Sequence, residues 1–164
     1  MKLYEPFKFL TDDECDHIVS CARKNIQVGT TLGKSNVRKN RVSWYKDSTN
    51  WSKWIEMFNK IDPVIDWIQT PQVAFYGKGE HYGWHTDTWS KLRTHVRYFT
   101  LTCELQSAPG ARLELIDREI SLSKGDAVIF KPQDKHRAIS PTQGERVSFT
   151  IWAMAKNANK VDRS

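Results

Sequence analysis

Residues 72–87, QVAFYGKGEHYGWHTD, contain two short runs with β-strand character joined by a glycine turn. The run Gln72–Tyr76 is apolar and aromatic, and the second run ends in His85-Thr86-Asp87. Side chains at positions i and i+2 of a strand point the same way, so His85 and Asp87 are predicted to face one space while Thr86 faces away. That arrangement suits two ligands of one metal ion.

Strand-like runs alternate with turns over the rest of the chain. The further runs are Thr94–Leu105, Arg112–Ile116, Asp126–Lys131 and Arg146–Met154. Turn signals that contain glycine separate these runs. Closely spaced strands after a helical N-terminal part predict an α+β, mainly β architecture: a double-stranded β-helix (jelly roll) with supporting N-terminal helices.

The N-terminal part carries helix signals. Thr11-Asp-Asp-Glu14 has the capping-box pattern, in which Thr11 and Glu14 satisfy each other's free backbone N–H groups. Apolar residues then follow at helical spacing, and the same spacing predicts a second helix near residues 50–61. Asp62-Pro63 has the pattern of an N-cap with a first-turn proline, which predicts a short helix through Ile68.

These signals predict one domain, as a length of 164 residues also does. The domain is expected over residues 1–155, with helical support at about residues 10–68 and the jelly-roll core at about residues 71–155. Residues 156–164 are polar and are expected to form a frayed tail.

Composition indicates a protein of a reducing compartment. The chain has three cysteines, an odd number with no CxxC pair, and its N-terminus lacks the apolar region of a secretory signal. No apolar run approaches the length that spans a membrane. We therefore expect a cytoplasmic protein with no membrane partner, and the sequence leaves its oligomeric state open.

The net charge of +6 indicates a basic surface that can attract nucleic acid or an acidic substrate. The densest cluster of cations lies in residues 34–41. It fits a solvated loop or edge strand, and it also fits a mobile segment that binds substrate. The charge alone does not choose between these two interpretations.

A third candidate ligand and a candidate anion-binding residue lie farther along the chain. His136 comes 49 residues after Asp87, beyond the Asp126–Lys131 run, and Arg146 follows ten residues later. Two histidines and one carboxylate form the ligand set of the non-haem Fe(II) oxygenases, which leaves other metal positions open. HxD alone is common, so the combination with a distal histidine and a strand arginine is the more specific signal.

Alternation along the last strand places polar groups on one face. Arg146, Ser148, Thr150 and Trp152 share that face, and apolar residues occupy the other. A guanidinium binds a carboxylate through two parallel hydrogen bonds, and a buried arginine without an anion is costly. The acidic partner could be a bound diacid, or it could be Glu80 or Glu104 in a structural salt bridge.

Together these motifs resemble the 2-oxoglutarate- and Fe(II)-dependent dioxygenases, nearest the prolyl 4-hydroxylase-like branch. The likeness runs from the Phe9–Cys15 stretch through the HxD region to Trp152. The resemblance implies that His85, Asp87 and His136 bind iron.

The resemblance also implies roles around the metal. Arg146 would hold the distal carboxylate of 2-oxoglutarate with help from Thr150 or Ser148, and Tyr76 would reach into the pocket. Arg41-Val-Ser43-Trp44 is similar to the flexible segment that covers substrate in prolyl hydroxylases. The expected substrate contacts are Arg41, Trp44 and Trp152.

The chain departs from the family pattern in three places. Collagen-type prolyl hydroxylases have lysine at the position of Arg146. Some relatives have a tyrosine at the position of Glu104, and the frequent Gly-Gly-x-Thr is Gly110-Ala-Arg-Leu here. These departures leave the iron chemistry intact and weaken the assignment of proline as the substrate.

The resemblance implies an enzyme that uses Fe(II), 2-oxoglutarate and O2, with ascorbate as a candidate reductant. The leading hypothesis is hydroxylation of a prolyl or other amino-acid side chain in a peptide, a protein or a free amino acid, with release of succinate and CO2. One alternative is a nucleic-acid-modifying oxygenase such as a dealkylase. The other is a non-catalytic jelly-roll module that holds Zn or Ni in the same three ligands.

Overall fold

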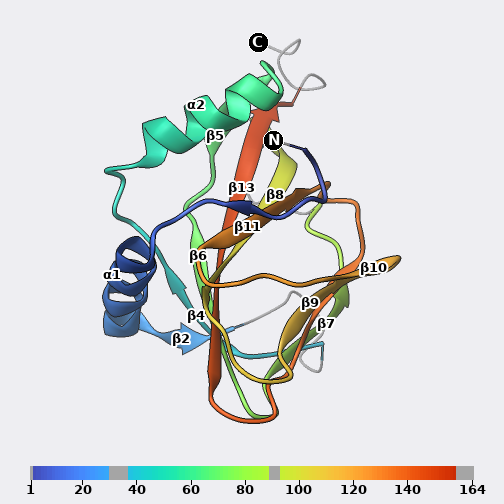
Figure 1. Ribbon diagram of the computed structural model, residues 1–164. Helices are drawn as coiled ribbons and strands as arrows, with labels where there is room; N and C mark the ends of the chain where they lie inside the picture. Colours follow the sequence, from blue (N-terminus) through green and yellow to red (C-terminus); the bar gives the residue numbers. More distant parts are fainter. Residues whose placement is uncertain (1, 30–36, 89–92, 158–164) are drawn as a thin grey trace.

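Two antiparallel sheets face each other in the computed structural model, which describes residues 2–29, 37–88 and 93–157 (Figure 1). Within these residues, the larger sheet runs in the order β1 (Phe7–Lys8), β11 (Asp126–Phe130), β8 (His95–Gln106), β13 (Glu145–Lys156), β6 (Gln72–Gly77), β4 (Arg41–Trp44) and β2 (Gln27–Val28), with β5 (Ile65–Ile68) paired to β13. The smaller sheet runs in the order β10 (Arg118–Ile120), β9 (Arg112–Leu115), β12 (His136–Ile139), β7 (His81–His85) and β3 (Arg38–Lys39). This is the predicted jelly roll with supporting helices.

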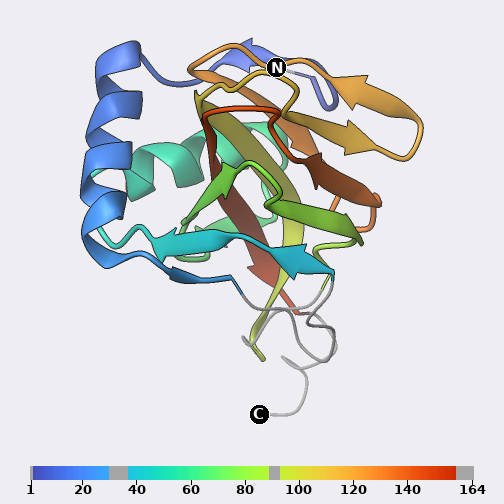
Figure 2. The same ribbon diagram turned by 90° about the horizontal axis from the view of Figure 1, so that it is seen from below.

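Both helices lie on the face of the larger sheet that points away from the smaller sheet (Figures 1 and 2). They are α1 (Asp12–Ala22), followed by the 3-10 turn η1 (Arg23–Asn25), and α2 (Trp51–Ile61). Thr11 caps α1, because its hydroxyl accepts a hydrogen bond from the backbone N–H of Glu14 at 3.2 Å. Trp54 and Phe58 form the buried stripe of α2.

The main hydrophobic core fills the space between these helices and the larger sheet. From β13, Val147, Phe149 and Ile151 belong to this core, together with Trp54 and Phe58 of α2. The period of two along a strand sends the residues between them to the opposite face, toward the smaller sheet. The helices therefore cover the apolar face, and the inner face of the sheet is left for polar side chains.

The segment Asp62–Ile68 corrects one prediction from the sequence, because it contains a strand and no helix. Asp62 is the C-cap of α2, and its Oδ1 accepts a hydrogen bond from the backbone N–H of Val64 at 3.1 Å. Asp62-Pro63 therefore forms an Asx turn that ends α2 and leads the chain into β5. The backbone of β5 pairs with β13, a long-range contact that local sequence does not encode. The helical support thus stops at Ile61.

The segment Arg41–Trp44 corrects a second prediction. It is strand β4, paired along its whole length with β6, so it is part of the larger sheet and not a flexible cover. Residues 34–36 of the basic cluster and residues 158–164 of the predicted tail lie outside the described residues. No helix in the described parts of the chain combines the length and apolar character needed to cross a membrane.

Phe149 lies at the centre of the contacts between α2 and the larger sheet. It is fully buried, and its ring contacts those of Tyr45 and Trp54, each at a centroid distance of 5.6 Å. Phe149→Ala should lower the free energy of unfolding by about 3–5 kcal/mol, because it leaves a cavity between α2 and the sheet. Urea denaturation measures this loss. Val64→Ala, at a site that is 52% exposed, should change stability by less than about 0.5 kcal/mol; a similar loss in both variants would contradict the assigned core.

Candidate metal centre

Two strands of the smaller sheet and the loop after one of them bring the three predicted ligands together. His85 ends β7 and His136 begins β12, and the two residues are directly opposite each other in the sheet register. Asp87 lies two residues beyond β7, where its backbone N–H donates to the carbonyl of Pro132 at 2.8 Å. One ligand atom from each of the three residues lies within 4.8 Å of the other two.

Backbone carbonyls fix the orientation of both imidazoles. Nδ1 of His85 is 2.7 Å from the carbonyl oxygen of Gly83, and Nδ1 of His136 is 2.9 Å from that of Asp134. A carbonyl only accepts, so each Nδ1 carries a hydrogen, and Nε2 is the ring atom that each histidine can offer to a metal. The two Nε2 atoms lie 3.5 and 3.4 Å from Oδ1 of Asp87. The three candidate ligand atoms therefore converge on one point.

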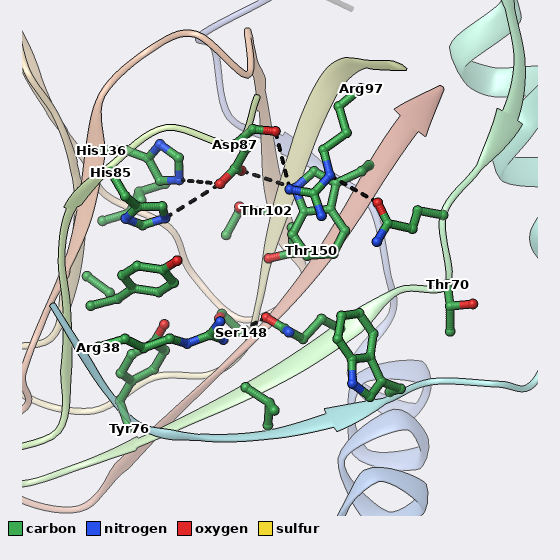
Figure 3. A pocket seen from close by; sticks show the side chains of 18 of the residues that line it. Arg38, Thr70, Tyr76, His85, Asp87, Arg97, Thr102, His136, Ser148 and Thr150 are labelled. Atoms are coloured by element: carbon green, nitrogen blue, oxygen red, sulfur yellow. Dashed lines mark hydrogen bonds and ion pairs between the residues drawn. The ribbon is translucent and has the colours of Figure 1, made fainter. Parts of the chain in front are cut away.

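The second oxygen of Asp87 is held by the larger sheet. Its Oδ2 accepts hydrogen bonds from the Thr100 hydroxyl at 3.0 Å and from Nε1 of Trp152 at 3.1 Å. Arg97 donates to the backbone carbonyl of Asp87 at 3.2 Å, and its guanidinium lies 3.9 Å from the Trp152 ring centroid. Figure 3 shows the imidazoles on one side of Asp87 and Arg97 on the other. These contacts turn Oδ1 toward the imidazoles.

Electrostatics prepare the same three groups for a cation. Burial, reinforced by His136, lowers the pKa of His85 to about 4. Burial opposes ionisation of Asp87, but the adjacent imidazoles and the Trp152 hydrogen bond hold the pKa of this carboxyl well below its usual range. Burial also opposes the charged form of His136, yet Asp87 raises its pKa above the ordinary value. Asp87 is thus ionised, and a cation between the three groups would replace the proton that it attracts to His136.

The centre opens into a cavity of about 780 Å³, which Figure 3 shows from close by. Besides the three candidate ligands, it is lined by the residues predicted to hold a co-substrate: Tyr76, Arg146, Ser148 and Thr150. Arg146 is only 2% exposed, and its Nε donates to Oε1 of Glu104 at 2.7 Å. Burial raises the pKa of the Tyr76 hydroxyl, which keeps it protonated and able to donate a hydrogen bond.

Two of the three expected substrate contacts reach this cavity. Trp44 and Trp152 both line it, with ring centroids 6.4 Å apart. Arg41 is not among the described residues that line it. Its Nη2 instead forms ion pairs with Glu80 at 2.8 Å and Glu145 at 2.7 Å. Arg41 therefore links β4 to β13 within the larger sheet and to the turn that precedes β7, and we do not retain it as a substrate contact.

Several residues that shape the centre were missed from the sequence. Thr100 orients Asp87, and Tyr82 stacks on His85 at a centroid distance of 3.5 Å. The guanidinium of Arg38 lies over the Tyr82 ring, 4.5 Å from its centroid. Period-two alternation through Thr100 and Thr102 could have indicated the polar inner face of β8. The contact between Arg38 and Tyr82 joins β3 to β7, and no local pattern indicates it.

Comparison with known proteins places this geometry in a family. Residues 71–154 match the sequence model of the 2OG-Fe(II) oxygenase superfamily. The chain belongs to this superfamily. Membership implies Fe(II) as the metal, with 2-oxoglutarate and O2 as co-substrates. The structure fits that implication, since two imidazole nitrogens and one carboxylate oxygen are the donor set of the facial triad.

Curated relatives match the chain over part of its length. A PKHD-type hydroxylase of Janthinobacterium sp. (strain Marseille) is 29% identical over 101 aligned residues, and the match covers 54% of this chain and 45% of the relative. A PKHD-type hydroxylase of Hyphomonas neptunium is 27% identical over the same shares. The match thus covers somewhat less than half the length of these relatives.

Solved structures match almost the whole described fold. The viral collagen prolyl hydroxylase vCPH of Paramecium Bursaria Chlorella virus-1, in its 2OG complex, superposes with a TM-score of 0.75 at 24% identity, over 94% of this chain and 97% of that one. A Pseudomonas putida prolyl-4-hydroxylase gives a TM-score of 0.69 at 15% identity, over 91% of each chain. A Trichoplax adhaerens prolyl hydroxylase, in complex with a hypoxia inducible factor peptide fragment, gives 0.66 at 14% identity, over 98% of this chain and 86% of that one. At these identities the likeness establishes the shared fold.

The hydrogen bond from Thr100 to Asp87 can be tested through metal affinity. Thr100→Val keeps the shape of the side chain and removes the donor, so Oδ2 of Asp87 is held by the Trp152 hydrogen bond alone. We expect metal affinity to fall by about 10–100-fold, the usual cost of losing a hydrogen bond that orients a ligand. Competition titration with a chelating dye measures it. Thr102→Val, two residues along on the same face of β8, should bind metal like the wild type; equal losses would contradict the role of Thr100.

Proposed function

We propose that this protein is a Fe(II)- and 2-oxoglutarate-dependent dioxygenase that hydroxylates a prolyl or other amino-acid side chain of a peptide or protein. The observation that carries the proposal is a shared cavity: the three candidate ligands and the buried Arg146 line the same space of about 780 Å³. One small diacid in this cavity could therefore contact both the metal and Arg146.

In this proposal His85, Asp87 and His136 hold the iron. Iron bound there, together with 2-oxoglutarate and O2, supplies the oxidising chemistry that converts a C–H bond to C–OH and releases succinate and CO2. The protein contributes placement and charge. The carbonyls behind the imidazoles and the donors behind Asp87 fix the donor atoms before any metal arrives.

Arg146 is proposed to bind the distal carboxylate of 2-oxoglutarate. Its guanidinium is buried and lies 5.8 Å from the centroid of the Tyr76 ring. The hydroxyls of Ser148 and Thr150 line the same cavity and can add hydrogen bonds to the diacid. A guanidinium in a cavity shielded from water holds a carboxylate more strongly than an exposed one does. The chain thus offers one charged anchor and two neutral donors.

The aromatic rim of the cavity supports a peptide substrate. Trp44 and Trp67 line the cavity and are 36% and 46% exposed, and Trp152 lies deeper at 6%. Flat indole faces suit an apolar ring such as that of proline. The names of the relatives also support hydroxylation, and the Trichoplax protein is recorded with a peptide. Free thiols at all three cysteines support the proposed cytoplasmic location.

The test is 2-oxoglutarate turnover in the presence of candidate substrates. Succinate should form with Fe(II), O2 and 2-oxoglutarate, and prolyl peptides should stimulate it more than free amino acids or single-stranded DNA. His85→Ala should abolish succinate formation and preserve the circular dichroism spectrum. Stimulation by DNA alone would favour a nucleic-acid oxygenase. If no substrate class yields succinate, the protein is a metal-binding module and the proposal is wrong.

Arg146 gives a second prediction for this site. Arg146→Ala should weaken 2-oxoglutarate binding by at least about thirtyfold, because a buried carboxylate loses its charged partner. Metal affinity should stay near the wild-type value, since Arg146 is not a ligand. Titration of the metal-loaded protein measures both quantities. Arg118→Ala, which removes an exposed arginine, is the control. Wild-type affinity for 2-oxoglutarate in Arg146→Ala would show that the diacid binds elsewhere.

Trp44 tests the proposed substrate surface. Trp44→Ala should raise the KM for a stimulating peptide by about tenfold, because an aromatic contact is lost at the rim. The KM for 2-oxoglutarate should change little, since that molecule binds deeper. Trp84→Ala is the matched control: Trp84 is 42% exposed and lies outside the described lining of the cavity. Equal effects of the two substitutions on the KM for the peptide would show that the peptide does not bind at this rim.

A further inference from the structure

Arg146 separates two cavities. One is the site cavity, and the other, of about 470 Å³, lies behind the guanidinium and is lined by residues of β8, β9, β10 and β13. Arg146 lines both cavities, whereas Glu104 lines only the second. Arg112 and Glu119 also line the second cavity, and their side chains are 41% and 71% exposed. The second cavity thus connects Glu104 with the protein surface without passing through the site.

Glu104 and Arg146 form a buried pair with room for another acceptor. Glu104 is 5% exposed, and its Oε1 receives the Nε hydrogen of Arg146. Among the described residues, Glu104 has the only carboxylate within 4.0 Å of this guanidinium. The contact uses Nε, so the Nη groups can still hold the distal carboxylate of a diacid. An ionised Glu104 therefore already places one negative charge at the proposed binding site for the diacid.

Charge balance then sets a condition on binding. Arg146 and an ionised Glu104 are neutral together, and a second carboxylate at the same guanidinium leaves one buried negative charge uncompensated. Such a charge is costly in a medium of low polarity, and the usual remedy is neutralisation by a proton. One proton on Glu104 restores the balance and changes the side chain from an acceptor into a donor. Protonated Glu104 is then a neutral hydrogen-bond donor, as is the tyrosine that some relatives have at this position.

The surroundings of Glu104 favour this protonation. Burial raises the pKa of Glu104 even with the Arg146 cation beside it. The other titratable or charged groups around it are Arg112 and Glu119 across the second cavity, and Cys15 and Cys103, whose thiols contact its backbone carbonyl. Of these, Arg112 is the one further cation, and it is bound to Glu114 at 2.8 Å.

We propose that Glu104 takes up one proton from solvent when 2-oxoglutarate binds to Arg146, and that it thereby acts as a positioning residue for the co-substrate. The inference rests on the proposed function. The balance is simple: a carboxylate and a proton become a carboxylic acid, and no other bond changes. Affinity for 2-oxoglutarate then falls as pH rises, by up to tenfold per pH unit wherever free Glu104 is ionised.

The experiment is calorimetric titration of Mn(II)-loaded protein with 2-oxoglutarate between pH 7 and 9. At each pH, two buffers of different ionisation enthalpy give the number of protons taken up. The wild type should take up close to one proton at the upper end of this range. Glu104→Gln keeps the shape and an acceptor for Arg146 but does not titrate. It should take up close to no proton and should bind 2-oxoglutarate at least about tenfold more tightly than the wild type does at pH 9.

Glu114→Gln is the matched control, because Glu114 is also buried and paired with arginine but lines neither cavity in the described chain. It should retain the wild-type proton uptake. Equal uptake in wild type and Glu104→Gln, or no uptake in wild type, would overturn the inference while leaving 2-oxoglutarate binding intact. Absence of 2-oxoglutarate binding in all three proteins would instead overturn the proposed function. Melting temperatures show that each variant is folded.

Discussion

The carboxylate of Asp87 joins the two sheets, and the site depends on that junction. Its Oδ1 faces the imidazoles of His85 and His136 from the smaller sheet. Its Oδ2 accepts hydrogen bonds from Thr100 and Trp152 of the larger sheet. Each oxygen thus contacts side chains of one sheet, so the carboxylate cannot rotate without breaking contacts to both sheets. The three candidate ligands are therefore positioned by the sandwich as a whole.

Alternation along β8 and β13 explains how a polar cavity can exist inside a well-packed domain. Leu101 and Phe149 point toward the helices and enter the core, whereas Thr100, Glu104 and Arg146 point toward the smaller sheet. The helices satisfy the apolar face, so stability does not require apolar residues on the inner face. The inner face is then free to carry the charged and hydroxyl groups that a small diacid needs.

Sequence alone predicted the parts of this structure that local patterns encode. His85, Asp87, His136 and Arg146 could be identified from their residue types, their spacing and their places on or after strand-like runs, and the structure brings them to one cavity. Asp62-Pro63 was misread as the start of a helix. An aspartate before a proline also suits an Asx turn, and pairing of β5 with β13 decides between them.

One missed contact, that of Arg38 with Tyr82, arises from pairing between distant segments. The stack of Tyr82 on His85 involves Arg38 of β3, which lies more than 40 residues earlier in the chain, and no local pattern specifies that register. Resemblance misled in one place. Arg41–Trp44 was compared with a flexible cover, yet its pairing with β6 makes it a strand of the sheet.

The most direct measurement of the central claim is an anaerobic crystal structure with Fe(II) and 2-oxoglutarate, with data collected at the iron absorption edge. The account predicts one anomalous peak in contact with Nε2 of His85, Nε2 of His136 and Oδ1 of Asp87, and a diacid whose far carboxylate contacts Arg146. An anomalous peak elsewhere, or a diacid that leaves Arg146 bound to Glu104 alone, would contradict it.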